Sequence, residues 1–410
     1  METRIITGLD IGTTKVCSVI VKQDADGQLN VVGIGSSPSY GLRKGVVVNI
    51  DQTVQSIKRA IGEAETMAGV KVDSVYVGIA GDHIRSLNSK GVVGVARDDH
   101  EITQEDVDRA INAAKALALP IDREIIHVIP QEFIVDDQDG IRDPIGLSGV
   151  RLEVEVHVVT AAVTSAQNIV KSVERAGFRV DEIVLEPLAS SLAVLDDDER
   201  NLGVVLVDLG GGTTDIAMFF EGHIRHTSVV ALGGQHVTND IAIGLRTPPE
   251  QAETIKIDHG CAFSDLIKKN ETLTVPGVGG RAPRIISRSV LIDIIQPRME
   301  EILTLAYQEM EKSDLMNLMA AGAVITGGGA ILPGTVELAE EIWGIPVKLG
   351  VPKYLGGLTE SVRSPVYATA VGLTLYGHRY QDEISFQRRK SDTLWEDVRE
   401  GITNFFKKFF

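Results

Sequence analysis

The sequence predicts an α/β protein built from two similar lobes with a cleft between them. The first observation is a pair of apolar segments, "RIITGLDIG" and "KVCSVIV", which are typical of two strands joined by a tight turn through Gly12, Thr13 and Thr14. The second is that "LGVVLVDLGGGTTDIAMFF" repeats this strand, turn and strand about 198 residues later, from Asp10 to Asp208. A repeat at this spacing implies two related lobes, each with one hairpin.

Helices are predicted between the strands. In residues 52–67, Val54, Ile57, Ile61 and Ala64 recur at helical spacing. These patterns divide the chain into a first lobe of 1–82, 161–195 and 361–380, an inserted subdomain of 83–160, a second lobe of 196–232 and 299–360, a further subdomain of 233–298, a linker of 381–392 and a final helix of 393–410.

The inserted subdomain is predicted to be a β-α-β-β unit. "VVGVA" is strand-like, and a helix begins at the capping signal Thr103-x-x-Asp106. "REIIHVIPQEFIV" and "VRLEVEVHVVTA" then follow as strands. Residues 233–298, which are rich in turns, interrupt the second lobe in the same manner.

Composition excludes several classes of protein. The net charge of −17, without a long basic face, argues against a nucleic-acid partner. Cys17 and Cys261 are far apart and lie in no Cys/His cluster, so we expect neither disulfides nor structural zinc, and a reducing cytoplasm. We also expect no signal peptide and no membrane span, because no apolar run approaches the ~18 residues that a span needs.

The two glycine turns have the chemistry of a phosphate clamp. Glycines let backbone N–H groups approach phosphate oxygens, threonine hydroxyls add donors, and an aspartate can hold the waters around Mg²⁺. Lys15 would add a point charge at the β and γ phosphates. A third cluster, Gly327, Gly328 and Gly329, follows another strand and would let a flat base lie against backbone.

Taken singly, each glycine turn can be an ordinary β-turn, but three such turns after three strands favour a nucleotide site. The chain has no G-x-x-x-x-G-K-[ST] motif, and no G-x-G-x-x-G opens a helix after the first strand. A P-loop and a dinucleotide-binding fold are therefore excluded.

The order "LDIGTTK", "VDLGGGTTD" and "ITGGGA" resembles the phosphate and adenosine motifs of the actin, sugar-kinase and heat-shock-chaperone ATPases. Within that superfamily the chain resembles the FtsA family of bacterial actin-like cell division proteins. "HVIPQEFIVDDQDGIRDPIGLSGVRLEVEVHVVT", "GTPPEQAETIKIDHGCA" and "VGGRAPR" carry the closer likeness, which covers essentially the whole chain. The resemblance implies an actin-like two-lobed ATPase fold with an inserted β-α-β-β subdomain and a C-terminal amphipathic helix.

The resemblance also implies a site for ATP and Mg²⁺. Asp10 and Asp208 are expected to hold Mg²⁺, through water. Glu253 and Lys256, at i and i+3 of a helix, match residues beside ribose and adenine, although an exposed ion pair is the alternative. The residues expected to bind the nucleotide are Asp10, Gly12, Thr13, Thr14, Lys15, Asp208, Gly210, Gly211, Gly212, Thr213, Thr214, Glu253, Lys256, Gly327, Gly328 and Gly329.

Partners follow from the same resemblance. The family polymerises at the cytoplasmic face of the inner membrane, at the division septum, and tethers filaments of FtsZ there. Arg298 matches a position that pairs with a carboxylate of the FtsZ C-terminal peptide, and Arg284 matches a region that governs self-interaction; a lone solvated arginine is the alternative for Arg298. The inserted subdomain is expected to contact other copies in the filament and the cytoplasmic tail of FtsN.

Catalysis is not predicted. Transfer of a phosphoryl group needs a water held in line, and Asp10 or Asp208 could hold it only through a geometry that the sequence does not show. The resemblance to the FtsA family implies weak or no ATPase activity, so the nucleotide is interpreted as a ligand for conformational change and polymerisation. His127, His157 and His236 are expected to be structural. The competing interpretations are a PilM-like pilus-assembly adaptor that binds a peptide, a small-molecule kinase and a chaperone.

The end of the chain predicts an amphipathic helix that lies in a membrane surface. The segment is too polar on one side to cross the bilayer, and packing on the protein itself or on a partner is the alternative. Residues 388–410 carry a net charge of +2, which leaves −19 on the rest of the chain. Attachment to anionic lipid therefore depends mainly on one apolar face, formed by Leu394, Trp395, Val398, Ile402, Phe405, Phe406, Phe409 and Phe410.

Overall fold

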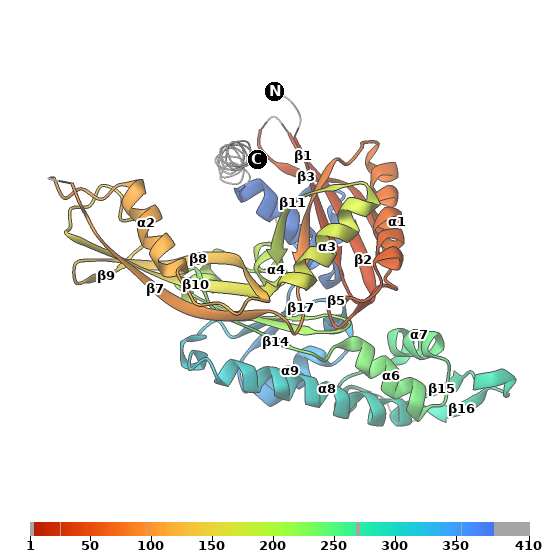
Figure 1. Cartoon of the computed structure of the whole chain (residues 1–410). Helices are drawn as coiled ribbons and strands as arrows, with labels where there is room; N and C mark the ends of the chain where they lie inside the picture. Colours follow the sequence, from red (N-terminus) through yellow and green to blue (C-terminus); the bar gives the residue numbers. More distant parts are fainter. Residues whose placement is uncertain (1–3, 25, 98, 268–270, 354, 381–410) are drawn as a thin grey trace.

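A computed structural model describes residues 4–24, 26–97, 99–267, 271–353 and 355–380 (Figure 1). The fold is mixed α/β, as predicted, with two lobes and an inserted subdomain that projects from one side. The linker 381–392 and the final helix 393–410 of the sequence analysis lie outside the described residues. Within the described part, no helix combines the length and the apolar character that crossing a membrane requires.

The first lobe contains a mixed sheet with the strand order β11-β6-β1-β2-β3-β19. β1, β2 and β3 form an antiparallel meander, whereas β6 and β11 run parallel to β1 after helical crossovers. Helices cover both faces, which explains why β1 and β2 are continuous apolar runs and not alternating ones. The strands are β1 (Ile5–Ile11), β2 (Lys15–Gln23), β3 (Leu29–Pro38), β6 (Ser74–Ile79), β11 (Arg179–Leu185) and β19 (Gly356–Gly357), with β4 (Leu42–Arg43) and β5 (Val46–Val47) as a separate pair.

Two layers of helices enclose this sheet. α1 (Ile50–Ala68) and α3 (Val163–Ala176) pack on one face, and α4 (Glu186–Val194) and helical residues 368–380 pack on the other. The helix predicted over 52–67 is thus confirmed. Asn49 caps it, because its Oδ1 accepts the N–H of Gln52, and Gly69 ends it at a φ of 65°.

The second lobe repeats the topology of the first. Its sheet has the order β14-β13-β12-β17-β18, in which β12, β13 and β14 are again an antiparallel meander and β17 and β18 are again parallel additions. The internal repeat predicted from Asp10 and Asp208 is therefore a repeat of structure. The strands are β12 (Val204–Leu209), β13 (Thr214–Phe220), β14 (His223–Val230), β17 (Ala323–Thr326) and β18 (Val347–Leu349).

Helices and a short hairpin complete the second lobe. α8 runs without a break through residue 298, where the sequence analysis placed a subdomain boundary, and its buried residues join the core of the lobe. The chain is also back in the first lobe's sheet at β19, before the expected return at residue 361. The elements are α5 (Asp197–Leu202), α6 (Gly234–Gly244), α7 (Pro249–His259), β15 (Thr272–Val275), β16 (Arg284–Ser287), α8 (Arg288–Glu311) and α9 (Thr335–Trp343), whereas α10 (Thr359–Val362) follows β19 and contacts β3 of the first lobe.

The inserted subdomain has its own sheet, of order β7-β10-β8-β9, covered by one helix. The predicted β-α-β-β unit is present, with the short strand β9 added at the edge. Thr103 caps the helix as predicted, and its N–H donates to Asp106 Oδ2 at 3.0 Å. The elements are β7 (Arg85–Gly94), α2 (Gln104–Lys115), β8 (Arg123–Val135), β9 (Gln138–Ile141) and β10 (Arg151–Ala162).

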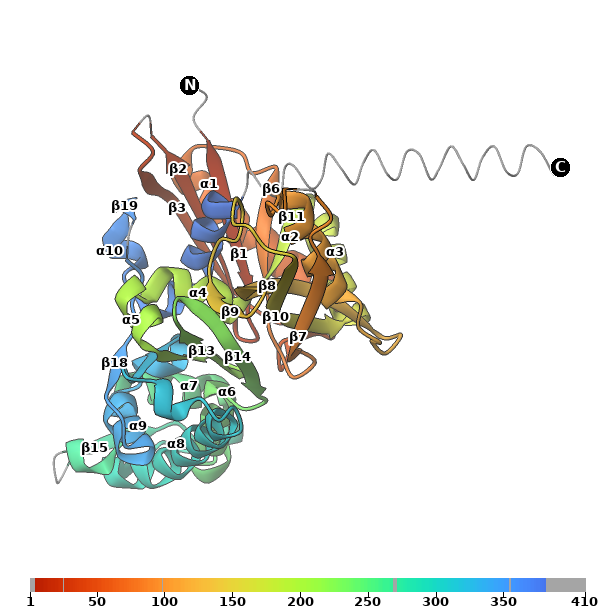
Figure 2. The same ribbon diagram turned by 90° about the vertical axis from the view of Figure 1, so that its left-hand side faces the viewer.

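The inserted subdomain packs against β14 of the second lobe (Figure 2). Polar side chains from its strands donate to backbone oxygens of β14, Gln131 Nε2 to Ile224 at 2.9 Å and Ser86 Oγ to Thr227 at 3.0 Å. His157 lies between them, with Nδ1 at 2.7 Å from Asn88 Oδ1 and Nε2 at 3.1 Å from Thr227 Oγ1. Hydrogen bonds to the edge strand thus fix the subdomain to the lobe.

Candidate functional site: a phosphate clamp between the lobes

The two glycine turns meet at one cavity between the lobes. Gly12 N–H donates to the Lys15 carbonyl at 3.0 Å, and Gly210 N–H donates to the Thr213 carbonyl at 3.0 Å, so both turns have the same closure. The cavity has a volume of about 470 Å³. All sixteen residues expected from the sequence line it except Thr214, whose buried hydroxyl donates to the Leu232 carbonyl instead.

The facing loops approach each other so closely that glycine is required at two positions. A Cβ on Gly211 would lie 2.6 Å from Thr14 Oγ1, and a Cβ on Gly212 would lie 2.4 Å from Thr13 Oγ1. Thr13 Oγ1 also accepts the Gly45 N–H at 3.1 Å, which holds its side chain in place. The clamp therefore closes because the second loop has no side chains where the threonines of the first loop lie.

The third glycine cluster has a different role at each position. Gly327 has a φ of 86°, and its Cβ would lie 2.3 Å from Asp208 Oδ1, while a Cβ on Gly329 would lie 1.7 Å from Leu209 Cδ2. These two glycines allow the loop after β17 to pack on β12. Gly328 alone faces open space. It is the member of the cluster at which a base can lie against backbone.

α7 brings Glu253 and Lys256 to the other side of the cavity. Lys256 Nζ donates to Glu253 Oε2 at 2.8 Å, to Thr238 Oγ1 at 2.9 Å and to the Gly234 carbonyl at 3.1 Å. The pair shares a face of the helix, as its spacing predicted. Apolar side chains of Val237, Ile257, Met299, Ile331 and Leu332 line the wall nearby. This end of the cavity combines apolar surface with an anchored ion pair.

Four acidic side chains from both lobes line the end of the cavity beside the glycine turns, and the sequence analysis named only Asp10 and Asp208. Glu186 begins α4, and Asp215 pairs with Asp208 across the β12–β13 ladder. Asp215 could have been found from the sequence, because a hairpin closed by the turn at 210–213 places residue 215 opposite residue 208. Thr369, Val366 and Gly234, which also line the cavity, come from segments without a recognisable motif.

Burial raises the pKa values of these carboxyl groups. The pKa of Asp10 is raised to about 7 by burial, with Lys15 opposing and Asp208 adding to the shift. Burial also raises the pKa of Asp208 to about 6 and that of Asp215 to about 7. The pKa of Glu186 lies well above its ordinary value because of burial and the nearby aspartates. Burial therefore disfavours the charged form of each of these four carboxyl groups.

Among the described residues, no group of three or more His, Cys, Asp or Glu side chains is arranged to hold a metal ion. The site nevertheless fits a divalent cation that comes with phosphate oxygens. Asp215 Oδ1 is buried without a hydrogen-bond partner, and carboxylates are the ligands that Mg²⁺ and its bound waters prefer. A cation here would relieve the charge that burial leaves uncompensated.

The three histidines of the sequence analysis have structural positions. His127 Nε2 accepts the Leu185 N–H at 3.0 Å, and burial lowers the pKa of His127 to about 4. Burial likewise lowers the pKa of His157 to about 4. His236 Nδ1 accepts the Gly233 N–H at the start of α6, at 3.1 Å. His127, His157 and His236 are not among the residues that line the cavity.

The two arginines assigned to partners are both engaged within the second lobe. Arg298 forms ion pairs through Nε and Nη2 with Asp240 and through Nη1 with Glu301. Arg284 donates to the Leu245 carbonyl at the end of α6. Arg298 is therefore not a lone solvated arginine, because its guanidinium already contacts two carboxylates.

Replacing Asp215 with Asn is expected to stabilise the ligand-free protein at pH 8. The pKa of Asp215 is raised from 3.8 to about 7. At a pH above both values, the charged carboxylate therefore lowers the free energy of unfolding by about 4 kcal/mol. Between pH 3.8 and about pH 7, Asp215 stays protonated in the folded state but loses its proton in the unfolded chain. The cost is therefore absent below pH 3.8 and complete above pH 7. Urea unfolding should show that the advantage of the variant grows across this window.

The matched control is Asp139→Asn, which changes an exposed aspartate of β9 in the same way. Its effect on the free energy of unfolding should be within about 0.5 kcal/mol of zero at every pH. An advantage of Asp215→Asn that stays constant from pH 4 to pH 8 would contradict the assignment of the raised pKa to this carboxyl group.

Comparison with known proteins gives two family matches. Residues 205–372 match the family "Cell division protein FtsA", and residues 81–160 match "SHS2 domain inserted in FTSA". The protein named "Cell division protein FtsA" from Pseudomonas aeruginosa is 53% identical over 380 residues, which cover 93% of this chain and 91% of the relative. The proteins of the same name from Neisseria meningitidis and Escherichia coli K12 are 49% and 42% identical, and they cover 91% and 92% of this chain and 90% and 91% of their own lengths.

Solved structures show the same fold at low identity. A PilM-PilN type IV pilus biogenesis complex contains a chain with a TM-score of 0.67 and 18% identity, covering 91% of this chain and 98% of that one. MreB5 of Spiroplasma citri bound to ADP has a TM-score of 0.55 and 16% identity, covering 94% and 99%. These likenesses confirm the predicted actin-like fold. The pilus protein shares that fold at an identity far below that of the cell division proteins.

Proposed function

Because this chain belongs to the FtsA family of cell division proteins, we propose that it binds ATP with Mg²⁺ between its lobes, polymerises on the inner membrane and tethers FtsZ filaments there. The observation that carries the nucleotide site is the convergence of both Asp-Gly-Thr-Thr loops on one cavity of about 470 Å³. A cavity of this size is in the range of small-ligand sites. The mode of attachment is a peripheral one, through residues 393–410.

Each end of the cavity has a part in the proposed binding. When bound, the nucleotide supplies phosphate charge, together with a divalent cation. Thr13, Thr14 and Lys15 supply donors and positive charge at the first loop, and Gly210–Thr213 supply an approach without side chains at the second. Asp10 and Asp208 would hold the waters of Mg²⁺. The base would contact an apolar surface formed by Ile257, Met299 and Ile331. It would lie beside Gly328, which faces open space.

The acidic groups support a nucleotide that acts mainly as a conformational ligand. A general base must be unprotonated to take a proton from an attacking water. Burial and the nearby aspartates raise the pKa of Glu186 well above its ordinary value, which disfavours the charged form that a general base needs. Slow hydrolysis, or none, is consistent with this environment.

The second lobe is the proposed site for the FtsZ C-terminal peptide, and the inserted subdomain is the proposed site for other copies of the chain and for the FtsN tail. We propose that Arg298 on α8 binds a carboxylate of the FtsZ peptide. That carboxylate would share the guanidinium group with Asp240 and Glu301, which already contact it. Arg284, beside α6, is the proposed self-interaction residue.

Replacing Arg298 with Ala is expected to weaken binding of the FtsZ C-terminal peptide by about tenfold, the effect of losing one charge-assisted contact. Fluorescence anisotropy of the labelled peptide measures this. Lys312→Ala is the matched control, because Lys312 caps the same helix at its far end and its side chain is 65% exposed. Equal effects of the two substitutions would exclude Arg298 as the contact.

Co-sedimentation of the full chain with anionic lipid vesicles, the FtsZ peptide and ATP tests the whole proposal. The protein should pellet with the vesicles, bring the peptide with it and pellet more strongly with ATP, because a polymer holds many membrane segments at once. If the protein pellets with the vesicles but does not bring the peptide with it, the adaptor function is refuted. Binding of the peptide without lipid would favour a PilM-like adaptor that docks on another membrane protein.

A further inference from the structure

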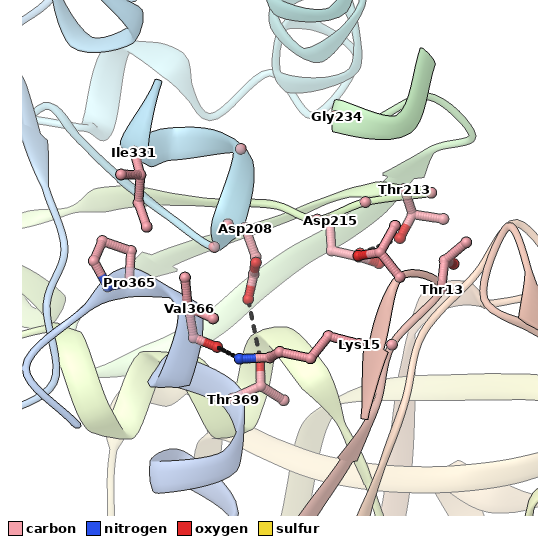
Figure 3. Close-up of a pocket in the computed structure, with 18 of the residues that line it drawn as sticks. Thr13, Lys15, Asp208, Thr213, Asp215, Gly234, Ile331, Pro365, Val366 and Thr369 are labelled. Atoms are coloured by element: carbon pink, nitrogen blue, oxygen red, sulfur yellow. Dashed lines mark hydrogen bonds between the residues drawn. The ribbon is translucent and has the colours of Figure 1, made fainter. Parts of the chain in front are cut away.

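One wall of the cavity is the start of the helix that leads toward the C-terminal segment. The turn Pro365–Tyr367 contributes Pro365 and Val366 to this wall, and Thr369 follows within helical residues 368–380 (Figure 3). The same turn contacts the loop after β17, which holds the third glycine cluster. A short segment therefore adjoins both the proposed nucleotide and the chain that continues to residue 381.

Side chains beside both glycine loops contact this segment. Lys15 Nζ donates to the Val366 carbonyl at 3.3 Å and lies 4.3 Å from the centre of the Tyr367 ring. Thr369 Oγ1 donates to Asp208 Oδ2 at 3.2 Å. Figure 3 shows the Lys15 side chain extended from β2 toward Val366, beside the Asp208–Thr369 pair. The ammonium group of Lys15, which is expected to contact the phosphates, thus already contacts the Pro365–Tyr367 turn.

Helical residues 368–380 are packed closely against the first lobe. A Cβ on Gly372 would lie 1.9 Å from the Ala189 carbonyl oxygen of α4, and a Cβ on Gly377 would lie 2.5 Å from the Tyr76 ring. Near the other end, Tyr376 donates to Glu182 at 2.9 Å, and its ring centre lies 4.6 Å from that of Tyr380. The first lobe therefore holds the body of this helix firmly, and only the start of the helix adjoins the cavity.

We propose that Lys15 is a latch that contacts either the Pro365–Tyr367 turn or the phosphates of the nucleotide. This inference rests on the proposed ATP site. A phosphate group outcompetes a neutral carbonyl oxygen and an aromatic ring for an ammonium group, because the contact is between full charges. Nucleotide binding then releases the turn and loosens the start of the helix. By linkage, whatever holds the turn against Lys15 weakens the binding of triphosphate.

Hydrogen exchange of the full chain, without nucleotide and with Mg-ATP or Mg-AMP, tests the latch. With ATP, the amides of 366–370 should exchange at least about threefold faster, while those of the two glycine loops exchange more slowly. AMP lacks the β and γ phosphates and should leave 366–370 unchanged. Binding of ATP without faster exchange at 366–370, or equal acceleration by AMP, would overturn the latch and leave the ATP site intact. A chain that binds no ATP would overturn both proposals.

Variants at Tyr367 give an independent measurement. Tyr367→Leu removes the ring that holds Lys15, so exchange at 366–370 should be fast without nucleotide and ATP should add little. A fluorescent ATP analogue should bind this variant about two- to fivefold more tightly, because one competing contact is gone. Tyr367→Phe keeps the ring and should behave as the natural chain does. Weaker binding by Tyr367→Leu, or equal changes in both variants, would contradict the latch.

Discussion

Removal of residues 394–410 is expected to abolish binding to anionic lipid vesicles. The rest of the chain carries most of the negative charge and is repelled by such a surface. Attachment depends on the apolar face of the proposed helix, whose eight side chains contribute on the order of 8 kcal/mol when partly buried, before ordering costs. Vesicle co-sedimentation of the full and shortened chains measures the loss.

A substitution on the polar face separates burial from charge. Exchanging Lys407 and Lys408 for Gln should weaken vesicle binding by only about 1 kcal/mol per charge and should leave binding to neutral vesicles unchanged. Unchanged sedimentation of the shortened chain would contradict the membrane segment and favour a terminal helix that packs on protein. Nucleotide binding by the shortened chain should be intact, which shows that the body is folded.

Replacing Gly212 with Ala is expected to weaken nucleotide binding by at least about a hundredfold, equivalent to some 3 kcal/mol. The added Cβ would lie 2.4 Å from Thr13 Oγ1 and 2.9 Å from Thr13 Cβ. Thr13 cannot rotate away without losing its hydrogen bond from Gly45 N–H. The two loops must therefore separate, and the phosphate clamp opens. Titration with a fluorescent ATP analogue measures the affinity.

Gly62→Ala is the control for this substitution. Gly62 lies within α1, and a Cβ there would meet nothing within 4 Å. This change should leave the affinity for nucleotide unaltered and raise the stability slightly, because alanine favours a helix by about 1 kcal/mol over glycine. Normal nucleotide binding by Gly212→Ala would show that the two loops do not clamp a common ligand.

The two glycine loops could be predicted from the sequence because the residues that form them are neighbours in the chain. A strand, a turn and a strand lie within about twenty residues around Asp10 and again around Asp208, so neighbouring positions in the chain decide the hairpin and its tip. Repetition of that unit then predicted two lobes with a cleft between them. The helix at 50–68 and the cap at Thr103 were equally local and equally predictable.

Other parts of the site depend on contacts between distant segments. Glu186 and Thr369 reach the cavity from the starts of two helices that cross at Gly372 and Ala189, and no pattern in either segment indicates a ligand. Lys15 was recognised as a cation, but its partner Val366 is 351 residues away. The pairing of Arg298 with Asp240 likewise joins two helices that only the folded lobe brings together.

By itself, the sequence determined the two glycine hairpins, their repetition and the family to which the chain belongs, because those features are written in short runs of residues. Only the tertiary structure decided which carboxyl groups share the cavity, how far burial raises their pKa values, and that Lys15 is held by the turn before the last described helix. The physical reason is that charge, burial and competition for a ligand arise from distances across the cleft, and the folding of the whole chain sets those distances.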